Sequence, residues 1–186
     1  MLFRSVSQSR SMAVSSISVS AAAGTNIITN QVHPMSLTSN NSGVGVDMGV
    51  LNLSALAFGT APFKYWAGTI VYRFQVVCSK YHRGRLRIQY SPDPGAIFST
   101  ALNTTYNHIV DIAPGKEFEV VIPYASQQPA LEVATLGDSS STVSNGSLRV
   151  SIQNEISAPD STSAIYLLTW IYAGDDYKVF VPTEGS

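Results

Sequence analysis

The chain has 186 residues and a formal net charge of −1, with 45% hydrophobic and only 12% charged residues. This length suits one domain with a substantial core, and the near-neutral charge excludes a domain that binds nucleic acid through a bulk basic field. Soluble proteins carry about 25% charged residues. The low value therefore fits either a surface that neighbouring subunits cover or a neutral surface rich in serine and threonine.

Cys78 is the only cysteine, so the chain cannot form an internal disulfide, and a reducing compartment such as the cytosol is the simpler inference. No apolar run reaches the length that spans a bilayer, and the first residues lack the apolar core of a signal peptide. The N-x-S/T sequons therefore fit polar loops better than glycan sites. They stand at Asn40, Asn52, Asn103 and Asn145.

The N-terminal part of the chain predicts an extended arm followed by two short strands. Residues 1–12 are polar and rich in serine and arginine, which is typical of an arm. Residues 13–20 alternate weakly between apolar and polar side chains. Residues 26–32 alternate again, until His33-Pro34 ends the pattern.

A long loop and a short helix are expected next. Residues 36–50 are rich in serine, asparagine and glycine, which predicts a loop. Residues 51–58 then place apolar side chains at helical spacing, and either Asn52 or Ser54 can serve as the N-cap.

Period-two alternation is clearest in the middle of the chain, where residues 69–78 and 85–90 each predict a half-buried strand. The polar stretch 79–84 joins them, and Pro92 and Pro94 end the second one because proline cannot donate to a sheet ladder. The side chains expected to point inward are Ile70, Tyr72, Phe74, Val76, Cys78, Leu86, Ile88 and Tyr90.

The second half of the chain contains the remaining strand patterns, which cover residues 106–112, 117–122, 148–153 and 164–172. A turn at 114–115, a long polar excursion at 125–146 and a break at 158–160 separate them. The last segment is apolar on both faces, which predicts a strand in the middle of a sheet or against a neighbouring molecule. About eight strands, no repeat and almost no helix predict an all-β sandwich.

One motif in the central region is more specific than the alternation. Trp-x-Gly, a strand, His-x-Gly-Arg-Leu, a second strand and a proline follow one another at fixed spacing. The residues concerned are Trp66, Gly68, His82, Gly84, Arg85, Leu86, Tyr90 and Pro92. This order resembles strands D and E of picornavirus-like capsid proteins, and most of all those of insect dicistroviruses and marine algal RNA viruses.

The resemblance implies an eight-stranded antiparallel jelly-roll sandwich with one short helix before strand D. It also implies an organisation into an N-terminal arm at 1–12, a single jelly-roll domain at 13–182 and a tail at 183–186. In a jelly roll, strands D and E lie in opposite sheets, so residues 79–84 would form a corner between sheets. The sequence alone leaves a corner and a hairpin equally open.

Residues that could carry chemistry are sparse, so we expect no catalytic residues, no metal site and no cofactor. His33, His82 and His108 have no metal-ligand neighbours at short spacing, and the chain contains no G-x-S-x-G elbow and no phosphate-binding glycine motif. Some dicistrovirus-like capsid proteins cleave themselves at an Asp-Asp-Gly motif. Here Tyr177 follows Asp175-Asp176, which favours a solvated turn.

Lys80, Arg83, Arg85 and Arg87 form the densest basic cluster of the sequence. The cluster could contact RNA. It could instead make inter-subunit pairs, or form a polar outer strand face whose arginine stems cover apolar surface.

The resemblance implies a structural capsid protein of a non-enveloped positive-strand RNA virus, localised to the virion and assembled in the host cytoplasm. Its partners would be the other capsid proteins of the same virus, in a pseudo-T=3 icosahedral shell around the RNA genome. A host receptor could contact exposed loops at 36–50 and 125–146. The alternative is a stand-alone β-sandwich module that binds carbohydrate or lipid in a pocket lined by the aromatic last strand. No site for an enzyme emerges from the sequence.

Overall fold

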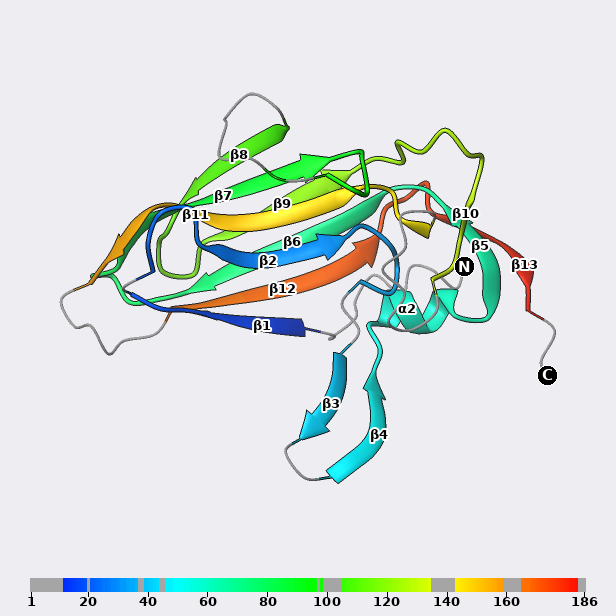
Figure 1. The fold of residues 1–186 in the computed structure, drawn as a ribbon, viewed down its shortest axis with the longest axis horizontal. Coiled ribbons are helices and arrows are strands. Elements are labelled where there is room, and N and C mark those ends of the chain that lie inside the picture. Colours follow the sequence, from blue (N-terminus) through cyan, green and yellow to red (C-terminus); the bar gives the residue numbers. More distant parts are fainter. Residues whose placement is uncertain are drawn as a thin grey trace.

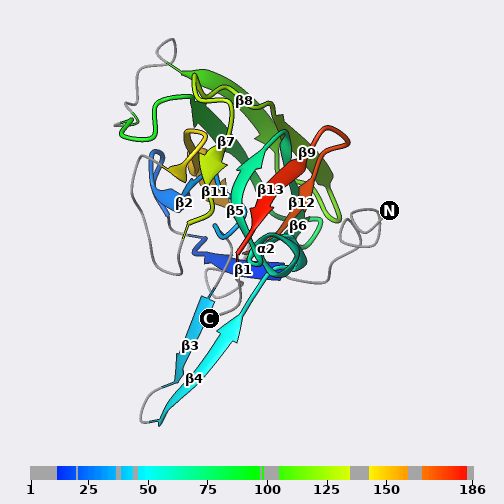
Figure 2. The same cartoon turned by 90° about the vertical axis from the view of Figure 1, so that its right-hand side faces the viewer.

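The fold of the protein is given by a computed structural model, which describes residues 12–19, 21–36, 39–43, 46–96, 98, 105–134, 143–158 and 165–183. Its main body consists of two antiparallel four-stranded sheets that face each other (Figures 1 and 2). The first sheet contains, in spatial order, β1 (Met12–Ile17), β12 (Ile165–Ala173), β6 (Ile70–Val77) and β9 (Glu117–Ile122). The second sheet contains β2 (Asn26–Gln31), β11 (Ser147–Ser157), β7 (Arg83–Ser91) and β8 (Tyr106–Asp111).

This topology confirms the predicted jelly-roll sandwich. The chain crosses between the sheets several times: β6 lies in the first sheet, while β7, which follows it in the chain, lies in the second. Residues 79–84 are therefore a corner between sheets, and the hairpin alternative is excluded. Within the two main sheets only β7 and β8 are consecutive strands that pair with each other. The side chains between the two sheets hold them together.

The core lies between the two sheets and follows the predicted alternation. Ile70, Tyr72, Phe74 and Val76 of β6 are all fully buried, and their burial contributes roughly 1.5–3 kcal/mol for each large side chain. Phe74 stacks on the ring of Phe118, with a 5.2 Å centroid separation. From the other sheet the core receives mainly aliphatic side chains: Leu86, Ile88, Val110, Leu148, Val150 and Ile152.

Strand β12 occupies the central position that its two apolar faces predicted, because it pairs with β1 on one side and with β6 on the other. Its inward side chains, among them Ile165 and Leu167, are fully buried. The outward side chains include Tyr166, which is exposed, and Trp170, which is partly exposed.

A small third sheet packs at one end of the sandwich and holds the Trp-x-Gly motif. It contains β10 (Leu131–Glu132), β5 (Phe63–Ala67) and β13 (Lys178–Pro182) in that order. Trp66 of β5 is fully buried and stacks on Tyr177, with ring centroids 5.9 Å apart. Gly68 has a φ of +124°, and a Cβ there would lie 2.5 Å from the Tyr177 Cα, so only glycine fits this approach.

The loop predicted at 36–50 is wrong, because β3 (Ser39–Gly43) and β4 (Val46–Asn52) form an antiparallel hairpin there. The hairpin projects away from the sandwich in both views (Figures 1 and 2). Serine, asparagine and glycine obscured a short alternation in the sequence, in which Val46, Met48 and Val50 are apolar. The predicted excursion at 125–146 likewise contains a strand, β10, although residues 135–142 lie outside the described part of the chain.

The predicted helix exists but begins later than residue 51. Helix α2 (Ala55–Thr60) starts after Ser54, whose Oγ accepts the backbone N–H of Ala57 at 3.0 Å. Ser54 is therefore the N-cap, and Asn52 belongs to β4. Within the described residues, the protein contains no helix with the length and apolarity that a membrane span requires.

Candidate functional site

The corner at residues 79–84 is built around His82. This side chain is buried, and its Nδ1 accepts the backbone N–H of Ser79 at 3.1 Å and lies 2.8 Å from the Ser79 Oγ. A second bond runs from the His82 backbone N–H to the Ser79 carbonyl at 3.2 Å. The imidazole thus closes the turn that carries the chain from β6 to β7, which is a structural task.

Gly84, Arg85 and Leu86 continue the motif into β7. A Cβ on Gly84 would lie 3.1 Å from the Ile156 Cγ1, so the small residue lets β7 approach β11 closely. Leu86 is fully buried in the core. Pro92 follows the last residue of β7, as its lack of an N–H requires.

The basic cluster is divided between solvent and internal contacts. Arg85 forms an exposed ion pair with Asp111, with Nε and Oδ1 2.7 Å apart. Arg87 is buried and donates from Nε to the Gln153 Oε1. Lys80 lies over the Tyr81 ring, 5.1 Å from its centroid. Together with the exposed Arg83, Lys80 makes the corner basic, whereas Arg87 belongs to the polar packing of the second sheet.

Asp175 and Asp176 lie in the turn between β12 and β13. Asp175 is exposed. The carboxylate of Asp176 accepts both the backbone N–H and the hydroxyl of Thr69, each at 3.0 Å. Asp176 therefore ties this turn to the residue that precedes β6. This geometry agrees with the turn predicted from the sequence.

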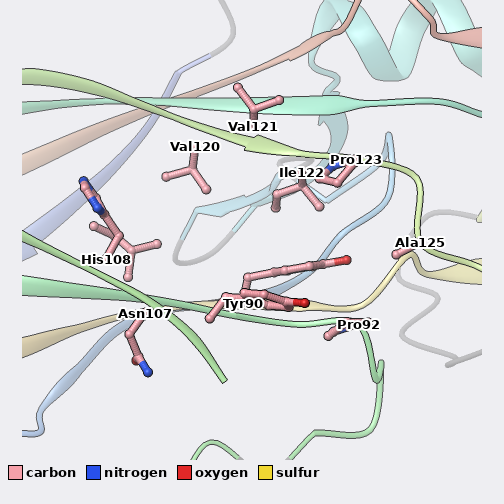
Figure 3. A pocket seen from close by; sticks show the side chains of 11 residues that line it. Tyr90, Pro92, Asn107, His108, Val120, Val121, Ile122, Pro123 and Ala125 are labelled. Atoms are coloured by element: carbon pink, nitrogen blue, oxygen red, sulfur yellow. The ribbon is translucent and has the colours of Figure 1, made fainter. Parts of the chain in front are cut away.

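A cavity of about 390 Å³ opens between β7, β8 and β9 (Figure 3). Tyr106 and His108 share the inward side of β8, since they pair with Tyr90 and Ile88 of β7. Tyr106 is nevertheless 71% exposed, so the sandwich is open at this edge. The described residues that line it are Ile88, Tyr90, Pro92, Tyr106, Asn107, His108, Val120, Val121, Ile122, Pro123 and Ala125.

The chemistry of this cavity is apolar. Among the described residues, its lining contains no carboxylate, lysine, arginine or cysteine. Tyr90 stacks on Tyr106 at 6.2 Å and donates its hydroxyl to the Asn145 carbonyl at 2.8 Å. Burial, reinforced by Tyr106, raises the pKa of Tyr90 to about 12, so its phenol stays neutral. The sequence predicted a pocket lined by the aromatic last strand, but no described residue of β12 lines this cavity. The outward residues of β12 point away from the sandwich interior.

Comparison with known proteins gave no matching family model. The structural polyprotein of Cricket paralysis virus is 29% identical over 140 residues, which is 65% of this chain and 15% of the polyprotein. The genome polyprotein of Avian encephalomyelitis virus (strain L2Z) is 30% identical over 169 residues, or 87% of this chain and 8% of the polyprotein. The chain therefore spans a small part of these curated relatives.

Solved structures extend the likeness over almost the whole chain. A marine algae virus of the order Picornavirales provides a chain with a TM-score of 0.80 and 28% identity, covering 96% of this chain and 73% of that one. Black queen cell virus provides another, with a TM-score of 0.78, 25% identity, and coverages of 94% and 72%. This chain belongs to the picornavirus-like capsid proteins. The carbohydrate- or lipid-binding module is correspondingly not favoured.

In this capsid protein the motif residues are spread over the scaffold. Trp66 and Gly68 support the third sheet at one end of the sandwich. His82, Gly84 and Leu86 form the corner and the start of β7. Among the described residues, no group of three or more His, Cys, Asp or Glu side chains could hold a metal ion.

Proposed function

We propose that this chain builds the wall of a non-enveloped positive-strand RNA virus, by assembling with sister jelly-roll proteins into a pseudo-T=3 icosahedral shell around the genome. The observation that carries the proposal is the likeness to a Picornavirales virus chain over 96% of the sequence, at a TM-score of 0.80. A rigid two-sheet sandwich suits this work, because many modest interfaces repeated over a closed shell give stability without strong pairwise affinity.

The proposed organisation is an arm at 1–12, a jelly-roll body at 13–182 and a tail at 183–186. The body would supply the shell wall. The segments 36–50 and 125–146 would present the surface that a host receptor contacts, and most of the hairpin β3–β4 belongs to the first of them. Assembly would take place in the host cytoplasm.

Contact with the packaged RNA would be limited to the basic corner. Lys80 and Arg83 are exposed there, whereas Arg85 is paired with Asp111 and Arg87 is buried. With a net charge of −1 for the chain, this corner can add only a local, salt-sensitive attraction for phosphate. The motif residues Trp66, Gly68, His82, Gly84, Arg85, Leu86 and Pro92 would act structurally.

The proposed role is non-enzymatic. The cavity in Figure 3 offers no carboxylate or cysteine next to a base, and the Asp176 carboxylate is occupied by Thr69. A nucleophile with a base in hydrogen-bond reach is what group-transfer chemistry requires.

Coexpression of the chain with the other capsid proteins of its virus tests the proposal. Sedimentation and negative-stain microscopy should reveal closed particles that contain this chain in equal number with its sisters. A chain that stays monomeric or in small oligomers beside all of its sisters would contradict the capsid role.

A further inference from the structure

The outer face of the first sheet carries several apolar side chains that this chain leaves exposed, with the polar Ser16 and Gln75 among them. The pairing register places one set of side chains from β1, β6 and β12 side by side on it. Val14 is 55% exposed, Val77 44% and Tyr166 43%. We call this set the aromatic face: Val14, Val77, Tyr166, Leu168, Trp170 and Tyr172.

The outer face of the second sheet is different. Its β7 side chains are arginine and glutamine, and they are engaged within the chain: Arg85 with Asp111, and Arg87 with Gln153. Arg149 of β11 donates to the carbonyls of Phe98 and Gly24, at 3.0 and 3.2 Å. Arginine side chains of the second sheet are thus engaged within the chain, and more of the exposed large apolar side chains lie on the first sheet.

Charged side chains border the aromatic face on its β9 side. Arg73 pairs with Glu117, and its guanidinium lies 5.9 Å from the centre of the Trp170 ring. Glu119 interacts electrostatically with Arg73 as well. One cation against two carboxylates leaves this border with a charge of −1.

Glu119 also contacts the aromatic face itself. Burial, together with the nearby Glu119 carboxylate, raises the pKa of Tyr172 to about 12. The phenol therefore stays protonated and can donate to Glu119. A surface of tryptophan, tyrosine and arginine with fixed side chains has the composition of protein–protein interface centres.

We propose that the aromatic face is the surface on which a sister jelly-roll capsid protein docks, and that this partner presents apolar side chains together with a lysine or arginine opposite Glu119. The proposal rests on the capsid role proposed above. This choice of partner is based on charge complementarity, because the negative β9 border favours a cation at the edge of an otherwise apolar contact.

Coexpression with the sister capsid proteins tests this docking. Tyr166→Ser and Glu119→Lys should each lower particle yield by about tenfold, the usual effect of losing a central interface contact. Matched controls lie outside the face. Ile109 is 48% exposed on the second sheet, and Glu155 is exposed on β11. Ile109→Ser and Glu155→Lys should leave the yield unchanged, and thermal unfolding of each free variant checks its fold.

Hydroxyl-radical footprinting gives a readout that does not depend on variants. Trp170 and Tyr166 should be oxidised more slowly in particles than in the free chain, because the docked partner excludes water from their rings. Equal oxidation rates, or variants that assemble as well as the controls, would overturn the docking surface while the capsid role stands. Failure of the unchanged chain to assemble would instead contradict the proposed function.

The identity of the partner can be read from charge rescue. A Lys→Glu or Arg→Glu change in a sister protein that restores assembly of Glu119→Lys supports the proposal. Rescue by Lys80→Glu or Arg83→Glu in this chain would show that a second copy occupies the face, and would overturn the assignment to a sister.

Discussion

Gly68 and Tyr177 come so close together that the backbone of one excludes a side chain on the other. This contact explains at the residue level why the motif requires glycine two positions after Trp66. The same site joins the third sheet to the sandwich, because Thr69, the next residue, is held by Asp176. The motif glycine therefore serves packing and not flexibility.

Gly68→Ala should destabilise the chain by about 3 kcal/mol or more, because it adds a left-handed conformation for alanine to a clash with backbone atoms. Gly115→Ala is the matched control, since Gly115 has a φ of +64° but no atom within 4 Å of its Cβ position. It should cost only about 1 kcal/mol. Urea unfolding of both variants measures the difference, and equal losses would contradict the packing explanation.

Buried tyrosines should make the fold sensitive to alkali. Burial raises the pKa of Tyr72 and of Tyr177 far above the ordinary value of 10.0. The folded chain therefore holds these protons more tightly than the unfolded chain. The contribution of these two tyrosines to the unfolding free energy is fully present below about pH 10 and is lost as the pH rises further. Unfolding free energy should thus fall steeply above pH 10.

Phenylalanine at these positions tests the cause. Tyr72→Phe loses the hydrogen bond with the Ser36 Oγ, and Tyr177→Phe loses the one with the Thr60 Oγ1, both 2.8 Å long. Each should cost about 1 kcal/mol at neutral pH. Each should also flatten the decline of stability between pH 10 and higher values, as measured by urea titrations. An unchanged alkaline slope in both variants would refute the assignment.

At the scale of one element, helix α2 shows how strongly the stability of a short helix depends on its N-cap. It has only six residues, so its own hydrogen bonds cannot sustain it, and it depends on the Ser54 cap and on the buried Leu56 and Ala57.

Ser54→Ala should cost about 1 kcal/mol of unfolding free energy, through loss of the bond to the Ala57 N–H. Ser126→Ala provides the comparison, because the Ser126 Oγ also accepts a backbone N–H, that of Gln128 at 3.2 Å, in an exposed turn. It should change stability by less than about 0.5 kcal/mol. Thermal unfolding of the two variants would distinguish a cap from an ordinary turn contact.

Strands β3 and β4 make their extensive contacts with each other and not with the sandwich. Replacing residues 39–52 by a short glycine-serine linker should therefore leave the unfolding free energy within about 1 kcal/mol, because isolated hairpins add little stability. Calorimetry of the shortened chain measures this. A large loss would show that the hairpin supports the core.

At the scale of the whole molecule, strands could be predicted from the sequence wherever burial on one face enforces a period of two. Strand β6 and the inward side of β7 are examples, because a shift of one residue would expose Tyr72 or Leu86. Prediction was poorer where composition hid the pattern, as in β4, or where a bulge broke it. In β11 the register shifts after Ile152, and the strand continues to Ser157, beyond residue 153 where the alternation in the sequence ends.

The cavity and the aromatic face were harder to derive, because both depend on which strands become neighbours. Tyr106 belongs to the inward side of β8 yet is exposed, and only the open edge of the sandwich explains this. Tyr166 and Trp170 predicted an apolar outer side for β12. Their alignment with Val14 and Val77 required the register between β1, β12 and β6.

The position of β12 has a consequence for how the chain is made. This strand is near the C-terminal end of the sequence, yet it separates β1 from β6. Met12 of β1 therefore cannot pair until Trp170 of β12 has been synthesised. A ribosome would have to deliver nearly the entire chain before the first sheet could close. Until then the inner faces of β1 and β6 remain open to other nascent chains, a delay that long-range pairing makes unavoidable.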